Sequence, residues 1–138
     1  MKLLKVVTTT LILSTSAVEA DISHCYDGID KDLNTTKEMI NSTISERTCL
    51  LDTINDALAA YSKKPVEVMQ GMNLYVINNP KGVKDDLKFI AEQIAQLELK
   101  IRCGRGHRHC GSFDIVESQI IATNFVRKKV TEILIQMK

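Results

Sequence analysis

The clearest hydrophobic pattern in this chain lies between Val83 and Ile101. Apolar residues recur there at spacings of four, three, four, three and four, which places them along one face of an α-helix. They are Val83, Leu87, Ile90, Ile94, Leu97 and Ile101. We expect a helix over 83–101 that turns this face toward the protein core. Packing of the same face against a second copy, in a homodimer, is the alternative.

Weaker helical spacing precedes this segment. One helix is expected to begin near Asp27, and a second is expected to be capped by Ser45 and to carry Leu51, Ile54 and Leu58 on one face. The polar run from Asn41 to Thr43 suggests the break between them. A single unbroken helix over about 27–62 is the alternative.

Two further helices are expected from their end signals. Pro65 suits the first turn of a helix that continues to Ile77, and Ser112 is a good N-cap for the last helix of the chain. With two prolines, six glycines and 4% aromatic residues, the chain lacks the turn signals of a sandwich or barrel. The pattern therefore predicts an all-α fold, a compact bundle of four or five helices in one domain over 21–138.

Residues 1–20 have the layout of a secretory signal peptide. Lys2 and Lys5 come first, an apolar stretch centred on residues 11–13 follows, and small residues end it at Ala20. The apolar stretch is far too short to span a bilayer, so we expect cleavage and no stable membrane insertion. The mature protein is predicted to be periplasmic or secreted.

Export changes how the four cysteines are interpreted. Cys25, Cys49, Cys103 and Cys110 all follow the predicted cleavage site, and an even number in an oxidising compartment predicts two disulfides. Cys103 and Cys110 are close enough for a local bridge, yet either could also reach back to Cys25. Long-range pairing is favoured, because it would constrain the unfolded chain more.

All three histidines lie close to a cysteine. If Cys25 paired with Cys110, then His24, His107 and His109 would converge, and three imidazoles suit zinc or copper. A reduced set of the last two cysteines with His107 and His109 is another arrangement. Metal binding through the histidines is kept as an alternative function; no cofactor is expected.

The chain is close to neutral, with 18 basic and 17 acidic residues, which does not favour nucleic acid as a partner. One stretch is locally basic: no acidic residue occurs between Glu98 and Asp114. Within it, the exposed and cysteine-flanked loop 104–109 is the predicted contact surface for a protein partner. Its candidate contact residues are Arg105, His107 and Arg108.

The sequence lacks the common catalytic motifs. It contains no H-E-x-x-H, no G-x-S-x-G and no P-loop, and a Cys–His nucleophile would need a thiol that disulfide pairing removes. We therefore expect a protein that is not an enzyme.

Two segments resemble a known family. The run Tyr75–Pro80 followed by Phe89–Ile94 and Cys103, with a looser match at Cys49, resembles small periplasmic all-helical immunity proteins against type VI secretion effectors. These are distantly similar to acid-stress chaperones of the HdeA type. The resemblance implies a non-catalytic binding protein, an immunity or inhibitor protein that blocks a partner enzyme or toxin. It also leaves an acid-stress chaperone as an alternative.

Overall fold

The structure is a computed structural model, which describes residues 21–27, 35–61, 66–70, 73–77, 80–104 and 110–137. These form helices α2 (His24–Asp27), α3 (Thr36–Ala60), α4 (Pro80–Cys103) and α5 (Ser112–Met137), and strands β1 (Val66–Gln70) and β2 (Asn73–Ile77). The predicted signal peptide lies outside the described residues. No described helix is both long enough and apolar enough to cross a membrane.

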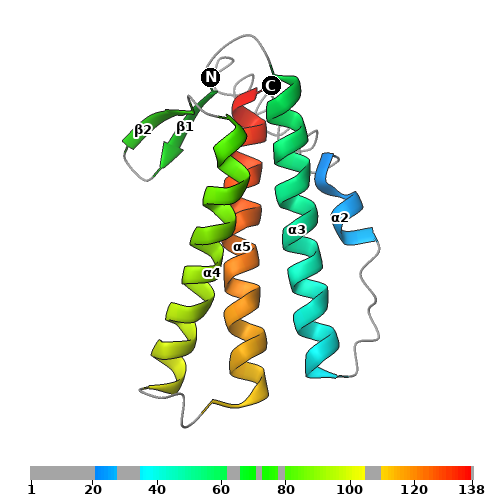
Figure 1. Ribbon diagram of the computed structural model, residues 1–138, viewed down its shortest axis with the longest axis vertical. Helices are drawn as coiled ribbons and strands as arrows, with labels where there is room; N and C mark the ends of the chain where they lie inside the picture. The colour runs from blue at the N-terminus through cyan, green and yellow to red at the C-terminus, as the bar shows by residue number, and fades with distance from the viewer. Residues whose placement is uncertain are drawn as a thin grey trace, which may run out of the picture.

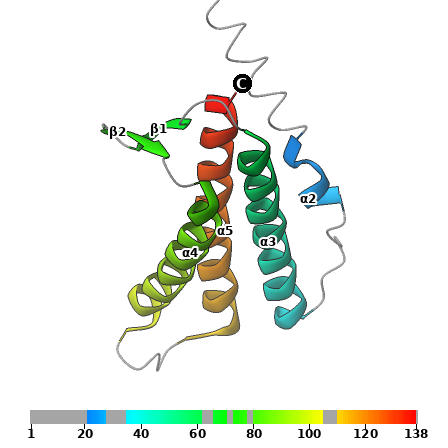
Figure 2. The same ribbon diagram turned by 45° about the horizontal axis from the view of Figure 1, so that its top comes forward.

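Three long helices make up the body of the protein (Figure 1). α3 and α5 run in the same direction, and α4 runs against both and contacts both. The short helix α2 lies on the outside of α3, as the turned view also shows (Figure 2). The prediction of an all-α helical bundle with two disulfides is confirmed.

The segment after α3 is a small β-hairpin, so the helix predicted from Pro65 to Ile77 is wrong. β1 and β2 pair antiparallel, from Val66 opposite Ile77 to Gln70 opposite Asn73. β1 contains two valines, and β2 contains a tyrosine, a valine and an isoleucine, residue types that favour strands. A short apolar run of this kind does not by itself distinguish a helix from a strand.

α3 is one unbroken helix of 25 residues. The predicted break before Ser45 is therefore wrong, and the alternative of a single continuous helix agrees better with the structure. Its N-cap is Thr35, whose hydroxyl accepts a hydrogen bond from the backbone N–H of Glu38 at 3.1 Å. The polar run at Asn41–Thr43 does not interrupt the helix. Thr43 is buried, and its hydroxyl donates to the hydroxyl of Thr123 on α5 at 3.2 Å.

α5 begins at Ser112, one residue after its cap. Gly111 occupies the N-cap position, and its N–H donates to the carboxylate of Asp114 at 2.9 Å, while the Asp114 N–H donates to the Gly111 carbonyl. This is the backward half of a capping box, in which the third helical residue binds the cap's backbone. The expected cap at Ser112 is therefore displaced by one residue.

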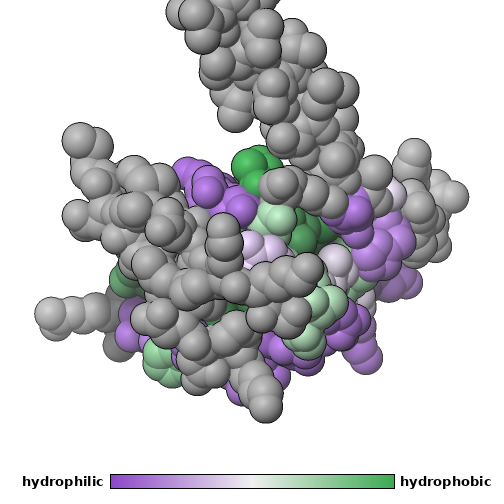
Figure 3. Space-filling model, turned by 90° about the horizontal axis from the view of Figure 1, so that it is seen from above, coloured by the Kyte–Doolittle hydropathy of each residue, from purple (hydrophilic) through white to green (hydrophobic). Residues whose placement is uncertain are grey.

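The core lies among the three long helices, and α4 contributes to it in an unexpected way. Leu87, Ala91 and Ala95 are buried in the core, and Val83 and Ile94 pack against it. Ile90, Leu97 and Ile101 of the predicted core face are 40%, 58% and 68% exposed. The expectation that this whole face is buried is wrong. The alanines allow α4 to approach its neighbours closely, and the larger residues lie beside the contact. In the view from above, strongly apolar side chains show near the centre of the bundle and hydrophilic ones mostly around its rim (Figure 3).

Candidate functional site

The two disulfides join Cys25 to Cys49 and Cys103 to Cys110. The preference for long-range pairing is right for the first and wrong for the second. α4 and α5 are antiparallel neighbours, so the end of α4 lies beside the start of α5 and Cys103 lies beside Cys110. α2 lies against the middle of α3, which brings Cys25 to Cys49, 24 residues away.

The first disulfide fastens α2 to the bundle together with a second contact. Ile22 and Cys25 are buried, and the guanidinium of Arg127 on α5 lies over the ring of Tyr26 at 4.9 Å. Burial raises the pKa of Tyr26, and the charge of Arg127 opposes that rise. The Tyr26 hydroxyl is buried without a hydrogen-bond partner among the described residues. α2 is therefore held to both α3 and α5.

Arg127 also forms an ion pair with Glu46, whose side chain is almost fully buried. Burial acts to lower the pKa of Arg127, but the hydrogen bond and the charge of Glu46 outweigh it, so this pKa lies above its usual value. A buried carboxylate without such a partner would be costly. Glu46 and Arg127 thus stabilise each other beside the disulfide.

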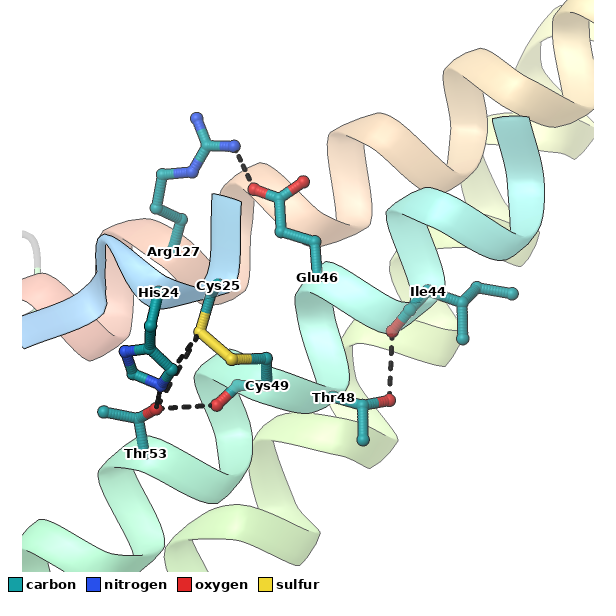
Figure 4. Close-up of a disulfide and its surroundings, with 8 residues drawn as sticks. All are labelled: His24, Cys25, Ile44, Glu46, Thr48, Cys49, Thr53 and Arg127. Atoms are coloured by element: carbon teal, nitrogen blue, oxygen red, sulfur yellow. Dashed lines mark hydrogen bonds and ion pairs between the residues drawn. A yellow bond between two sulfur atoms is a disulfide. The ribbon is translucent and has the colours of Figure 1, made fainter. Parts of the chain in front are cut away.

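Three polar groups meet on the opposite side of this disulfide from the Glu46–Arg127 pair (Figure 4). The Nε2 atom of His24 lies 3.7 Å from the sulfur of Cys25 and 3.2 Å from the hydroxyl oxygen of Thr53. The Thr53 oxygen lies 3.8 Å from the same sulfur, and its hydroxyl donates to the backbone carbonyl of Cys49 at 2.8 Å. A histidine and a threonine therefore both contact the sulfur of Cys25.

A groove of about 460 Å³ opens over this cluster. It is lined by His24, Cys49 and Thr53, with Asp52 and Asp56 further along α3. Asp52 is paired with Lys84 of α4 at 2.6 Å, and the hydrogen bond and charge of Asp52 raise the pKa of Lys84. One sulfur of the disulfide, that of Cys49, therefore belongs to a residue that lines an open groove.

A second groove, of about 480 Å³, flanks α2 on its α5 side. It is lined by Ile22, Ser23, Tyr26, Arg127 and Thr131. The short helix thus has a groove on each side, and the disulfide lies between α2 and α3 beneath the first of them.

The disulfide pairing on which the predicted metal site depended does not form. Convergence of the three histidines required Cys25 to pair with Cys110, and Cys25 pairs with Cys49 instead. His107 and His109 lie outside the described residues. His24 and the two sulfurs beside it place their potential ligand atoms within 4.8 Å of one another, but both sulfurs are oxidised.

The other arrangement, with Cys103 and Cys110 as reduced ligands, is likewise contradicted by their disulfide. Their sulfurs lie within 4.8 Å of a carboxylate oxygen of Asp114. The two disulfides therefore differ in their polar neighbour, which is an imidazole in one case and a carboxylate in the other.

The predicted partner contacts Arg105, His107 and Arg108 lie outside the described residues, and so they remain predictions. The described residues before and after that loop show the charge of the surface next to it. Lys100 is exposed on α4, and Arg102 pairs with Glu98 and with Glu117 on α5, at 3.8 and 3.3 Å. The C-terminal end of α4 is therefore both basic and, at Ile101, apolar.

Sequence reasoning missed the residues that surround the first disulfide. Thr53 follows Cys49 by four residues, one helical turn, so its position beside the sulfur could have been inferred once the pairing was known. Glu46 and Arg127 are 81 residues apart, and no local pattern connects them.

Comparison with protein-family models, with curated proteins and with solved structures gave no match to this chain. The resemblance to immunity proteins stays a prediction.

Proposed function

We propose that this protein is an exported, non-catalytic binding protein that blocks a partner protein, in the manner of an immunity or inhibitor protein. The observation that carries the proposal is the exposed apolar face of α4 on a bundle with one disulfide at an end and one near the middle of α3. Two disulfides suit an oxidising compartment such as the periplasm or the extracellular space.

The apolar face is formed by large side chains that water reaches. Ile90, Leu97 and Ile101 follow one another at spacings of seven and four, so they lie along one line of the helix, and Phe89 lies next to Ile90. Phe113, at the start of α5, is 77% exposed and lies at the same end of the bundle as Ile101, because the Cys103–Cys110 disulfide joins the two helix ends. Apolar surface of this kind marks a site of protein–protein interaction.

The rigidity of this surface supports an inhibitor. α4 is a 24-residue helix packed on two others, so the backbone that carries its exposed side chains is fixed before a partner arrives. A preorganised surface loses little conformational entropy on binding, and a few central side chains then carry most of the affinity.

The charges around the face indicate the chemistry of the partner. Lys100 lies beside Ile101, and the basic loop follows directly after Cys103. We therefore propose a partner with an apolar patch bordered by acidic residues. Such a partner would contact α4 through its apolar side chains and the loop through Arg105 and Arg108.

The test compares charge-introducing variants of the apolar face with a matched control. A partner would be isolated by cross-linking in the native host, and its affinity and activity measured with purified proteins. The double variant Leu97→Glu, Ile101→Glu is expected to lose at least about 100-fold in affinity, since two charges would be buried against an apolar surface. Gln96→Glu, which adds a charge at an exposed polar position of the same helix, is expected to leave affinity within about threefold.

Two results would count against the proposal. One is unchanged affinity and unchanged inhibition of the partner in the double variant. The other is a concentration-dependent dimer that the same double variant abolishes, since the face would then be covered by a second copy. Combined alanine substitution of Arg105, His107 and Arg108 tests the contribution of the loop separately.

A further inference from the structure

The Cys25–Cys49 disulfide has a donor aimed at one of its sulfurs. Two lines of evidence place a hydrogen on Nε2 of His24. The hydroxyl hydrogen of Thr53 is used by the Cys49 carbonyl, so toward His24 the Thr53 oxygen is an acceptor. A disulfide sulfur carries no hydrogen, so the contact between His24 and Cys25 also needs an N–H on the ring. The Nε2–H group therefore lies between Thr53 and the Cys25 sulfur.

An N–H donor at this place changes the chemistry of Cys25 when the disulfide opens. A neighbouring imidazole stabilises the thiolate and lowers the pKa of a cysteine thiol. In thiol–disulfide exchange, the sulfur with the lower thiol pKa leaves faster. Cys25 is thus the better leaving group of the pair.

Access to the two sulfurs is also unequal. Cys25 is buried beneath α2, with 6% of its surface exposed, whereas Cys49 is partly exposed and lines the 460 Å³ groove. A thiol that enters the groove reaches the sulfur of Cys49 first. Access and leaving-group stabilisation therefore favour the same direction of attack.

We propose that the Cys25–Cys49 disulfide is a thiol-exchange site for small external thiols. The external thiolate attacks the Cys49 sulfur, a bond forms between these two sulfurs, and the Cys25–Cys49 bond breaks. Its electron pair leaves with the Cys25 sulfur as a thiolate, which the His24 N–H stabilises. A second external thiolate then attacks the external sulfur of the mixed disulfide and releases Cys49 as a thiolate. The external thiols are oxidised to their own disulfide and supply both electrons.

The second disulfide serves as an internal comparison. The carboxylate of Asp114 lies near the sulfurs of Cys103 and Cys110 and is kept there by its hydrogen bond from Gly111. A negative charge destabilises a thiolate, so this disulfide lacks the feature that favours exchange at Cys25.

Several charged groups from neighbouring elements surround the exchange site. Asp52 and Asp56 of α3 line the same groove as His24, and Lys84 of α4 is paired with Asp52. The Glu46–Arg127 pair, between α3 and α5, lies on the other side of the disulfide. The exchange site therefore faces charged groups of α3, α4 and α5.

The test measures the reduction rate of each disulfide in the oxidised protein with reduced glutathione, by timed alkylation and peptide mass spectrometry. The variant His24→Leu is compared with the wild type at the same pH, so that ionisation of glutathione cancels in the ratio of rates. We expect the variant to reduce Cys25–Cys49 about 3- to 10-fold more slowly. The rate at Cys103–Cys110 is expected to be unchanged.

A purely structural role for His24 predicts the opposite direction. Loss of its contact with Thr53 would loosen α2, expose the disulfide and speed its reduction. Equal or faster reduction in His24→Leu would overturn the proposal. The variant His24→Gln retains a neutral N–H donor, and its rate is expected to lie between those of the wild type and His24→Leu.

Discussion

Replacing Ala91 by leucine tests how α4 is rotated in the bundle. Ala91 is fully buried where α4 approaches its neighbours, and leucine adds three carbon atoms there. Insertion of extra carbons into a packed core costs about 1–3 kcal/mol of unfolding free energy. Helix propensity does not confuse the result, because leucine and alanine are both strong helix formers.

Two controls lie on the same helix. Gln93→Leu introduces the same side chain at an exposed position, where we expect a change of about 0.5 kcal/mol or less. Leu97→Ala removes a side chain that is 58% exposed. Full burial of a leucine contributes about 1.5–3 kcal/mol, and less than half of this side chain is buried, so we expect the unfolding free energy to fall by roughly 1 kcal/mol.

The measurement is thermal and urea unfolding followed by circular dichroism, with both disulfides intact. A loss of 2 kcal/mol in Ala91→Leu corresponds to a fall in Tm of about 7–8 °C for a domain of this size. If instead Ala91→Leu were neutral and Leu97→Ala cost about 3 kcal/mol, the face from Val83 to Ile101 would be the core face and the rotation of α4 described above would be wrong.

Three further predictions concern groups buried between helices. Thr123→Val deprives the buried Thr43 hydroxyl of its acceptor and should cost about 1–3 kcal/mol in urea unfolding, whereas Thr123→Ser should cost less. The raised pKa of Tyr26 stabilises the fold below pH 10.0 and loses that contribution as pH rises through the folded-state value, so Tyr26→Phe should unfold with a weaker dependence on pH above 10. Serine at both Cys103 and Cys110 removes a short cross-link, with a sequence separation of seven, and should lower the unfolding free energy by about 2–3 kcal/mol.

Each of these predictions has a result that would contradict it. Equal stability of Thr123→Val and the wild type would mean that the two threonine hydroxyls are not paired in the core. Parallel curves of stability against pH for Tyr26→Phe and the wild type would mean that the phenol titrates alike in the folded and unfolded chains. An unchanged urea midpoint without the second disulfide would mean that this cross-link does not constrain the unfolded chain.

The sequence by itself determined the helical segment around α4, the bundle class and the number of disulfides. These depend on interactions within a few residues, such as the four-three spacing of Val83 to Ile101, or on counting, as for the four cysteines. The hairpin was missed because the run from Val66 to Ile77 is short, and short apolar runs fit a strand as well as a helix.

The tertiary structure alone decided which residues meet. In α4 the buried stripe runs through Leu87, Ala91 and Ala95, and packing against α3 and α5 leaves Ile90, Leu97 and Ile101 of the predicted face exposed. Cys25 pairs with Cys49 only because α2 lies against the middle of α3, and the same placement brings His24 beside the disulfide. Contacts of this kind join residues that are distant in the chain, so their geometry depends on the whole arrangement of helices rather than on any local pattern.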